Sequence, residues 1–308
     1  MRWDDFRRSD NVEDSRGDDG GFGGGGGGGM GGLPIGGGGL GIGTVVVLGL
    51  IGWALGIDPS ILIGGAELVN SGRHQQQPYQ PPAKQAGAPK DQMGDFVAAV
   101  LGNTEDTWTE IFKNSGQQYS VPRLRLYSGA VQGGCGFAQA AMGPFYCPND
   151  RRIYLDTSFF RDMRDRFRGC SGKGCEFAEA YVMAHEVGHH VQNLLGILPK
   201  AQAAQRAAGS KAEANSIQVR VELQADCLAG VWANHSNQKW NSLEPGDVEA
   251  AMQTAAAIGD DRLQRQTQGY VVPDAFTHGS SAQRQRWFMT GFKEGKVSAC
   301  NTFTSAGI

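Results

Sequence analysis

The chain has 308 residues, of which 28 are Lys or Arg, 31 are Asp or Glu and 40% are hydrophobic, enough to bury the core of one large domain or two smaller ones. The four Arg and seven acidic residues of positions 1–32 account for the whole net charge of −3, and no run of Lys and Arg follows. We therefore expect no nucleic-acid partner. The 47 Gly residues cluster without a three-residue period, which excludes collagen.

Residues 1–38 are acidic and polar at first and then nearly pure Gly. Such a segment buries too little apolar surface to offset its conformational entropy, so we predict a disordered N-terminal tail.

Residues 39–58 contain the uncharged run LGIGTVVVLGLIGWALGI. Roughly 20 helical residues cross a bilayer core of about 30 Å, so this run predicts one transmembrane helix in a lipid bilayer. The alternatives are a buried core helix and a flexible Gly-rich linker. The run begins too late in the chain for a cleaved signal peptide. Residues 59–90, rich in Gln and Pro, are predicted to form a linker.

Four Arg residues precede the apolar run, whereas the basic residues that follow it lie further away. The positive-inside rule then predicts a single-pass protein of the cytoplasmic (inner) membrane. Its N-terminus would lie in the cytoplasm, and everything after the run would be exported to the periplasm or the extracellular space.

Residues 91–308 have the composition of a globular domain. Alternating apolar and polar side chains predict strands at 123–127 and 152–156. Apolar residues at helical spacing predict helices at 93–101, 104–112, 159–167, 177–195, 211–234, 245–258 and 281–295. Because the few strands precede most of the helices, we expect an α+β fold that is mostly helical with a small sheet.

Six Cys residues all follow the apolar run, and an even number fits an oxidising compartment. Closeness in sequence favours Cys135 with Cys147 and Cys170 with Cys175, which leaves Cys227 for Cys300. The alternative is six reduced, buried thiols in a cytoplasmic domain. A zinc site made of Cys is disfavoured because the chain has no CxxC pair.

The segment YVMAHEVGHH contains an HExxH motif made by His185, Glu186 and His189. On a helix, residues four apart share a face, so both imidazoles can bind one metal ion. Glu186 would act as general base on the attacking water. The alternative is a pair of packing histidines, although the apolar residues around the motif recur at helical spacing and leave its polar side chains facing a cleft.

Zinc in a catalytic site needs a third protein ligand. The pattern HExxHxxGxxH fails here because Gln192 and Leu195 stand where it requires Gly and His. The segment VELQAD offers Glu222 as the third ligand, with Asp226 on the same helical face to accept a hydrogen bond from a ligating His. A solvated acidic pair is the alternative, but the neighbouring residues are apolar and predict burial.

Four segments carry a resemblance to a known family: YVMAHEVGHHVQ, VELQADCLAGVW, GPFYCPNDRRIYLD and DAFTHGSSAQR. Together they resemble the bacterial YpfJ-type neutral zinc metallopeptidases, and the resemblance extends over the whole chain. HExxH followed by ExxxD is also similar to membrane-associated gluzincin peptidases. The resemblance implies a zincin fold that holds one Zn²⁺ per chain through His185, His189 and Glu222, with Glu186 as base.

His278 is the candidate donor to the oxyanion of the reaction, and Arg284 follows it by six residues. Distant gluzincins have a similar His followed by Arg at this spacing, with Pro where this chain has Gly279. The alternative is a His in a capping loop with an Arg on the surface.

These features predict a membrane-anchored zinc endopeptidase with a peptide or protein substrate. The substrate would add as an extended strand beside an edge strand at Ile153–Leu155, where main-chain hydrogen bonds give affinity; an ordinary core strand is the alternative. A different class of function also fits, namely a non-enzymatic zinc-binding envelope scaffold or interaction protein.

Overall fold

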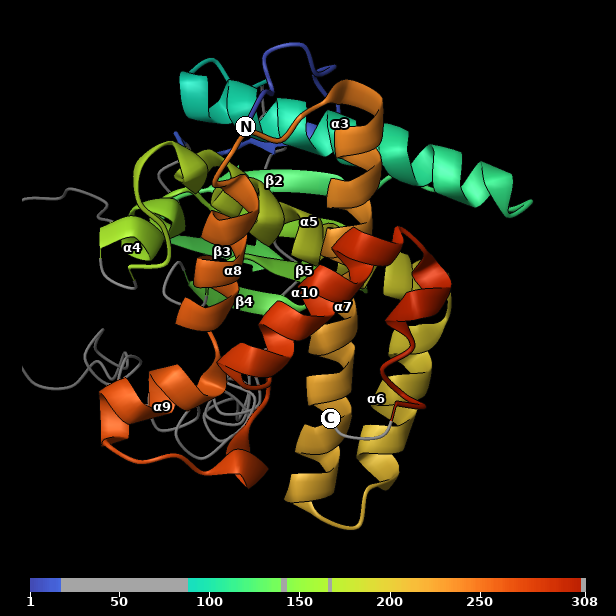
Figure 1. Ribbon diagram of the computed structural model, residues 1–308, viewed down its shortest axis with the longest axis vertical. Helices are drawn as coiled ribbons and strands as arrows, with labels where there is room; N and C mark the ends of the chain where they lie inside the picture. Colours follow the sequence, from blue (N-terminus) through green and yellow to red (C-terminus); the bar gives the residue numbers. More distant parts are fainter. Residues whose placement is uncertain (18–87, 140–142, 166–167, 306–308) are drawn as a thin grey trace, which may run out of the picture. The chain divides into compact units, whose positions relative to one another are not determined.

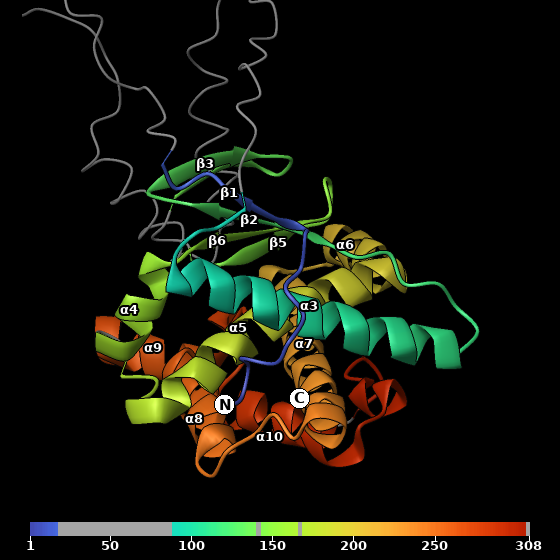
Figure 2. The same cartoon turned by 90° about the horizontal axis from the view of Figure 1, so that it is seen from above.

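A computed structural model of the protein describes residues 1–17, 88–139, 143–165 and 168–305, and these residues form a small sheet, a separate hairpin and a layer of helices. The strands lie together on one side of the described residues and most of the helices on the other (Figure 2), and α3 runs along the top of both in the view of Figure 1. The expected α+β fold, mostly helical with a small sheet, is confirmed.

The main sheet has four strands in the order β1-β2-β6-β5. The three strands β1, β2 and β6 run parallel, and β5 runs antiparallel to β6. A separate hairpin pairs β3 with β4. The strand bounds are Val12–Asp14 for β1, Arg123–Tyr127 for β2, Ala130–Gly133 for β3, Gly136–Gln139 for β4, Phe145–Cys147 for β5 and Arg152–Asp156 for β6.

Strand β6 is covered on both faces because its side chains alternate between two hydrophobic clusters. Ile153 and Leu155 pack in the main core with the helices. Tyr154 packs in a second cluster with Val131 and Ala138 of the β3–β4 hairpin. The strands predicted at 123–127 and 152–156 are therefore present with those bounds. The expected edge position of Ile153–Leu155 is wrong, since β6 pairs with a strand on each side.

The helices surround two long central ones, α5 and α7 (Figure 1). The helices predicted at 93–101 and 104–112 form one continuous helix, α3. Helices α6 and α9 were not predicted. The α-helices are α3 (Gln92–Asn114), α4 (Ser158–Asp165), α5 (Cys175–Leu194), α6 (Ile197–Ala207), α7 (Lys211–Trp240), α8 (Asp247–Ala257), α9 (Asp260–Gln268) and α10 (Ser281–Glu294); the 3₁₀ helices are η2 (Gly172–Gly174), η3 (Pro273–Ala275) and η4 (Val297–Cys300).

Helix α10 packs closely across α7 because glycine faces backbone at the crossing. A Cβ atom on Gly291 of α10 would lie 1.8 Å from the carbonyl oxygen of Cys227, and one on Gly230 of α7 would lie 2.1 Å from that of Phe288. This approach brings Arg284 of α10 beside the carboxylates of α7.

The first 17 residues are not a disordered tail, as predicted for 1–38, but part of this fold. Strand β1 adds to the edge of β2, and the side chains of Trp3, Phe6 and Val12 are buried in the main core. The prediction failed because these apolar residues are spaced among charged ones, so composition alone did not reveal them. The rest of the tail, the predicted transmembrane helix at 39–58 and most of the linker at 59–90 lie outside the described residues.

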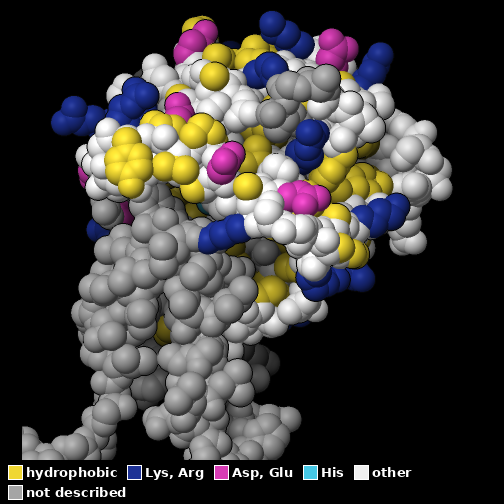
Figure 3. All heavy atoms as spheres, turned by 90° about the horizontal axis from the view of Figure 1, so that it is seen from below, with side chains coloured by type: hydrophobic (Ala, Val, Ile, Leu, Met, Phe, Trp, Pro, Cys, Tyr) yellow, Lys and Arg dark blue, Asp and Glu magenta, His cyan; other side chains and the backbone are white. Residues whose placement is uncertain are grey.

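Among the described residues, no helix is long and apolar enough to cross a membrane. On the face drawn in Figure 3, Lys and Arg side chains are scattered among acidic and hydrophobic ones.

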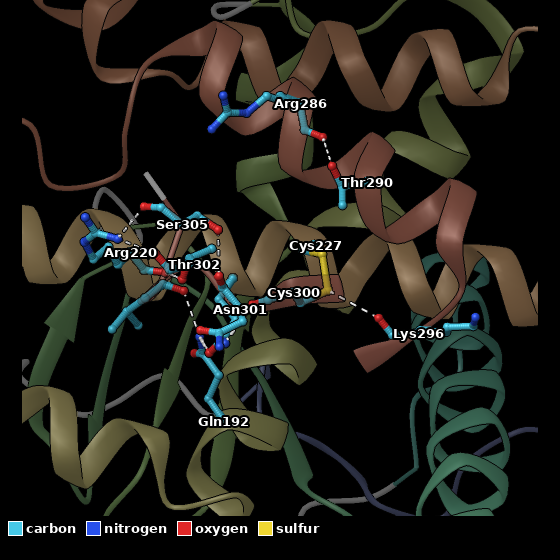
Figure 4. The surroundings of a disulfide bond; sticks show 12 residues. Gln192, Arg220, Cys227, Arg286, Thr290, Lys296, Cys300, Asn301, Thr302 and Ser305 are labelled. Atoms are coloured by element: carbon cyan, nitrogen blue, oxygen red, sulfur yellow. Dashed lines mark hydrogen bonds between the residues drawn. A yellow bond between two sulfur atoms is a disulfide. The ribbon is translucent and has the colours of Figure 1, made fainter. Parts of the chain in front are cut away.

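Three disulfides are present and match the pairs favoured by the sequence: Cys135–Cys147, Cys170–Cys175 and Cys227–Cys300. The third joins α7 to η4 across 73 residues of chain (Figure 4). The alternative of six free thiols is therefore wrong.

Candidate metal centre

Two helices bring the predicted metal ligands together. His185 and His189 lie one turn apart on α5, and Glu222 faces them from α7. Nε2 of His185 lies 3.1 Å from Oε2 of Glu222, and Nε2 of His189 lies 3.4 Å from the same oxygen. Among the described residues, this is the group of His, Cys, Asp and Glu side chains whose ligand atoms lie close enough to share an ion, all within 4.8 Å of one another.

These distances fit a zinc ion. Two ligands of a tetrahedral zinc, each about 2.1 Å from the metal, lie roughly 3.4 Å from each other. The contacts that Glu222 makes with the two imidazoles agree with that spacing. Two nitrogens and one carboxylate oxygen are also the donor set that catalytic zinc prefers, with one coordination position left for water or substrate.

Asp226 holds the first ligand, as predicted, but it has more partners than the sequence suggested. Nδ1 of His185 donates to its Oδ1 at 2.8 Å, and the hydroxyl of Tyr181 donates to the same oxygen at 2.6 Å. Nε of Arg284 donates to Oδ2 at 2.8 Å. Burial raises the pKa of Asp226, but the charge and hydrogen bonds of Arg284, followed by those of His185, outweigh it and hold the pKa well below its usual range.

Arg284 is 3% exposed, so the alternative of a surface arginine is wrong. Its guanidinium donates two hydrogen bonds to the two oxygens of Asp226. The fixed fork of an arginine matches a carboxylate in this way, and it leaves His185 with one orientation and its Nε2 toward Glu222. Arg284 therefore positions His185, a predicted metal ligand, through Asp226.

The other two candidate ligands, His189 and Glu222, are held by glutamines that were not predicted from the sequence. Nδ1 of His189 donates to Oε1 of Gln192 at 2.8 Å, and Gln218 donates to Oε1 of Glu222 at 2.7 Å. Both glutamines lie within one helical turn of the ligand that they hold, and that spacing could have indicated them. Gln192 also donates to Gln224, whose amide donates to the carbonyl oxygen of Cys300. Figure 4 shows Gln192 beside the segment that the disulfide fixes.

Glu186 lies on α5 directly after the first ligand and is 7% exposed. Burial raises the pKa of Glu186, and this effect exceeds the opposite effect of the neighbouring His189 and His185. A carboxylate with a raised pKa takes and releases a proton more readily near neutral pH, which suits a general base.

His278 lies near the three ligands but not among them. Its side chain is 46% exposed, and its positive charge helps lower the pKa of Glu222. Asp260, at the start of α9, fixes it: Oδ2 accepts the backbone N–H groups of Thr277, His278 and Gly279, and Oδ1 lies 3.3 Å from Nδ1 of the ring. Partial desolvation of the ring lowers the pKa of His278, but the hydrogen bond and charge of Asp260 outweigh it and raise the pKa overall. No sequence pattern indicated Asp260.

His190 points away from the three ligands and joins α5 to the sheet. Its Nε2 donates to the carbonyl oxygen of Ser120 at 2.6 Å, and its Nδ1 accepts from the hydroxyl of Tyr146 at 3.0 Å. Burial lowers the pKa of His190 to about 4, so the ring is neutral at pH 7. Because Tyr146 is the middle residue of β5, this contact fixes the end strand of the sheet beside the metal-site helix.

Comparison with known proteins agrees with a site whose donor set suits catalytic zinc. A family model described as "Putative neutral zinc metallopeptidase" matches residues 1–303. The chain belongs to this family, which confirms the resemblance seen in its motifs. It is 47% identical over 307 residues to the uncharacterized protein YpfJ of Escherichia coli (strain K12), covering 98% of this chain and 99% of that protein.

A second relative is the uncharacterized protein Rv2575 of Mycobacterium tuberculosis (strain ATCC 25618 / H37Rv). It is 42% identical over 265 residues, which cover 82% of this chain and 85% of that protein. No solved structure matches the chain.

Proposed function

We propose that this protein is a membrane-anchored zinc endopeptidase with a zincin-like active site. The observation that carries the proposal is the convergence of His185, His189 and Glu222 at zinc-ligand spacing, with Glu186 buried beside the first ligand. A structural zinc site normally has four protein ligands, whereas three ligands and an adjacent base favour catalysis over a scaffold role.

The proposed reaction is hydrolysis of a peptide bond. When bound, zinc polarises the scissile carbonyl and lowers the pKa of a water molecule. Glu186 takes a proton from the attacking water as the water oxygen bonds to the carbonyl carbon. The same carboxyl then gives that proton to the amide nitrogen as the C–N bond breaks.

His278 would donate a hydrogen bond to the carbonyl oxygen as negative charge develops there. Asp260 supports this role because it fixes the loop through three backbone N–H groups and keeps the ring protonated to higher pH. Asp260 is thus a positioning residue for His278.

The substrate would bind as an extended strand along β5 (Phe145–Cys147). Strand β5 lies at the edge of the sheet, and among the described strands it pairs with β6 alone. Its contact with His190 places it next to α5, the helix that carries two of the three candidate ligands.

The first test is metal content together with cleavage of a peptide library. We expect one zinc per chain and measurable cleavage, and we expect Glu222→Ala to lose most of its zinc and all cleavage. Glu249→Ala, an exposed site on α8, is the control and should keep both. Unchanged zinc stoichiometry and affinity in Glu222→Ala would remove this residue from the ligand set.

A second prediction separates His278 from the ligands. His278→Ala should lower kcat by about 10²-fold, the usual effect of losing one oxyanion donor, and leave zinc in place.

Asp260→Asn removes the charge that raises the pKa of His278. Since the ring donates while it is protonated, the alkaline limb of the kcat profile should move to lower pH. NMR titration of His278 in the zinc-loaded protein measures the same shift without substrate, and an unmoved pKa would contradict the role of Asp260.

We further propose that the metallopeptidase domain lies outside the cytoplasm and is anchored through residues 39–58. The three disulfides support export, since such bonds persist in oxidising compartments. The anchor rests on the apolar run in the sequence.

A further inference from the structure

The N-terminal segment, defined as residues 1–17, packs as part of the metallopeptidase domain, although residues 18–87 separate the two in sequence. Strand β1 pairs with β2 in the register Val12–Leu124 to Asp14–Leu126. Further backbone hydrogen bonds extend the contact, from Ser9 to Ala98 and from Ser15 to Leu126. The segment thus supplies a whole strand of the main sheet.

The segment also fills the hydrophobic core. The ring of Trp3 meets Phe96 of α3 edge to face at 5.3 Å, and Phe6 meets Trp240 of α7 at 6.1 Å. Trp3 and Phe6 are 8% and 4% exposed. Large aromatic side chains buried to this extent are a main source of folding free energy, so the domain is incomplete without them.

The strongest sign of permanent docking is the carboxylate of Glu105 on α3, which is 3% exposed. Its partners come from the N-terminal segment: Arg7 donates at 2.7 Å, Ser9 at 2.7 Å and Asn11 at 2.8 Å. A buried carboxylate without partners is strongly unfavourable. Glu105 is therefore stable at this buried position of α3 only while the N-terminal segment is docked.

We infer that the N-terminal segment lies on the same side of the membrane as the metallopeptidase domain. A chain that crosses a bilayer once puts its two flanks on opposite sides. A cytoplasmic N-terminus joined by a single crossing to an exported domain, as the sequence predicted, would separate β1 from β2 and Glu105 from its three partners. We therefore keep the proposed attachment to the membrane through residues 39–58 but not the predicted single crossing. The two parts of one sheet must share a compartment. The charges of the four N-terminal Arg residues then stabilise the fold and do not indicate a cytoplasmic N-terminus. Three of them pair with α3 or its N-cap: Arg7 with Glu105, Arg8 with Asp95 and Arg16 with Asp91.

Cysteine accessibility in the full-length protein tests this inference. Asp5 and Lys211 are both exposed, one in the segment and one at the start of α7. Asp5→Cys and Lys211→Cys are each treated with a membrane-impermeant maleimide, in spheroplasts and again after permeabilisation. Peptide mapping without reduction confirms that the three native disulfides have formed.

We expect the two positions to react alike, both in intact spheroplasts if the domain is exported. Labelling of both only after permeabilisation would still support a shared compartment and would instead contradict export. Labelling of Lys211→Cys with protection of Asp5→Cys in intact spheroplasts, or the reverse, would overturn the inference.

A second variant tests whether the docking itself exists in the membrane-bound protein. A Cβ atom on Gly102 would lie 2.1 Å from the carbonyl oxygen of Arg7, so Gly102→Ala should displace the segment. Trypsin should then cut after Arg7 and Arg8 about tenfold faster or more, because cleavage follows the population of the undocked form. Thr109→Ala, at an exposed position of the same helix, should leave the rate unchanged. Equal rates for Gly102→Ala and the native chain would also overturn the inference.

Discussion

Replacing Glu186 with Gln should leave the protein folded and zinc-loaded but lower kcat by about 10³-fold, within the range that general bases contribute. The amide has nearly the same shape as the carboxylate but cannot accept the proton of the attacking water. Because Glu186 is not among the three ligands, zinc content should not change. Single-turnover cleavage and metal analysis on the same sample measure both quantities.

Glu176→Gln is the matched control for that experiment. Glu176 lies in the first turn of the same helix with a side chain that is 47% exposed, so the same chemical change there should leave kcat unaltered. Turnover by Glu186→Gln close to the native rate would rule out both the role of this residue and the proposed mechanism.

The second large effect concerns stability. Asp226→Asn should lower the free energy of unfolding by about 3–5 kcal/mol, because it leaves the buried guanidinium of Arg284 without its counter-charge. Zinc affinity should fall by about 10- to 100-fold as His185 loses its anionic partner. Denaturant unfolding and competition with a chelator measure the two losses.

The double variant Asp226→Leu with Arg284→Met separates these effects. Apolar residues of similar volume can replace a buried ion pair at little net cost in stability, so much of the unfolding free energy should return. Zinc affinity should stay low, since His185 still lacks its acceptor. Recovery of full zinc affinity in the double variant would show that Asp226 does not orient the ligand.

The same carboxylate gives stability a defined pH dependence. The folded protein holds the pKa of Asp226 well below its unfolded value, so the charge is more favourable in the folded chain. Its contribution is therefore fully present above the unfolded pKa of about 3.9 and is lost as the pH falls below it. Acid titration of the Asp226→Leu, Arg284→Met protein should show a weaker loss of stability than the native chain.

The grouping of the three candidate ligands could be predicted from sequence because each motif acts within one helix. HExxH and ExxxD place side chains four residues apart, so helical geometry alone fixes their common face. Asp260 could not be predicted in this way. It reaches His278 because the start of α9 meets the loop before α10 in the folded chain, 18 residues apart in sequence.

The order of the strands in the sheet could not be predicted from sequence either. Strand β6 was predicted from its alternating side chains, but its neighbours were not. Strand β5 has three residues, too few to show a period. Strand β1 also has three, and Glu105 pairs with Arg7 across 98 residues of chain. Pairings over such separations depend on the tertiary fold, and composition around Arg7 indicated disorder instead.

Strand β1 also protects the protein against self-association. The N–H and C=O groups of β2 that face β1 form hydrogen bonds in the native sheet, including that from Leu124 to Asn11. A chain shortened to begin at residue 85 would present that edge unpaired, next to the apolar hollow that Trp3 and Phe6 had filled. An open edge beside exposed apolar surface is a template for pairing with another copy, so the shortened domain would aggregate as it is synthesised. Residues 1–17 thus protect the finished sheet against pairing with another copy when the protein is concentrated.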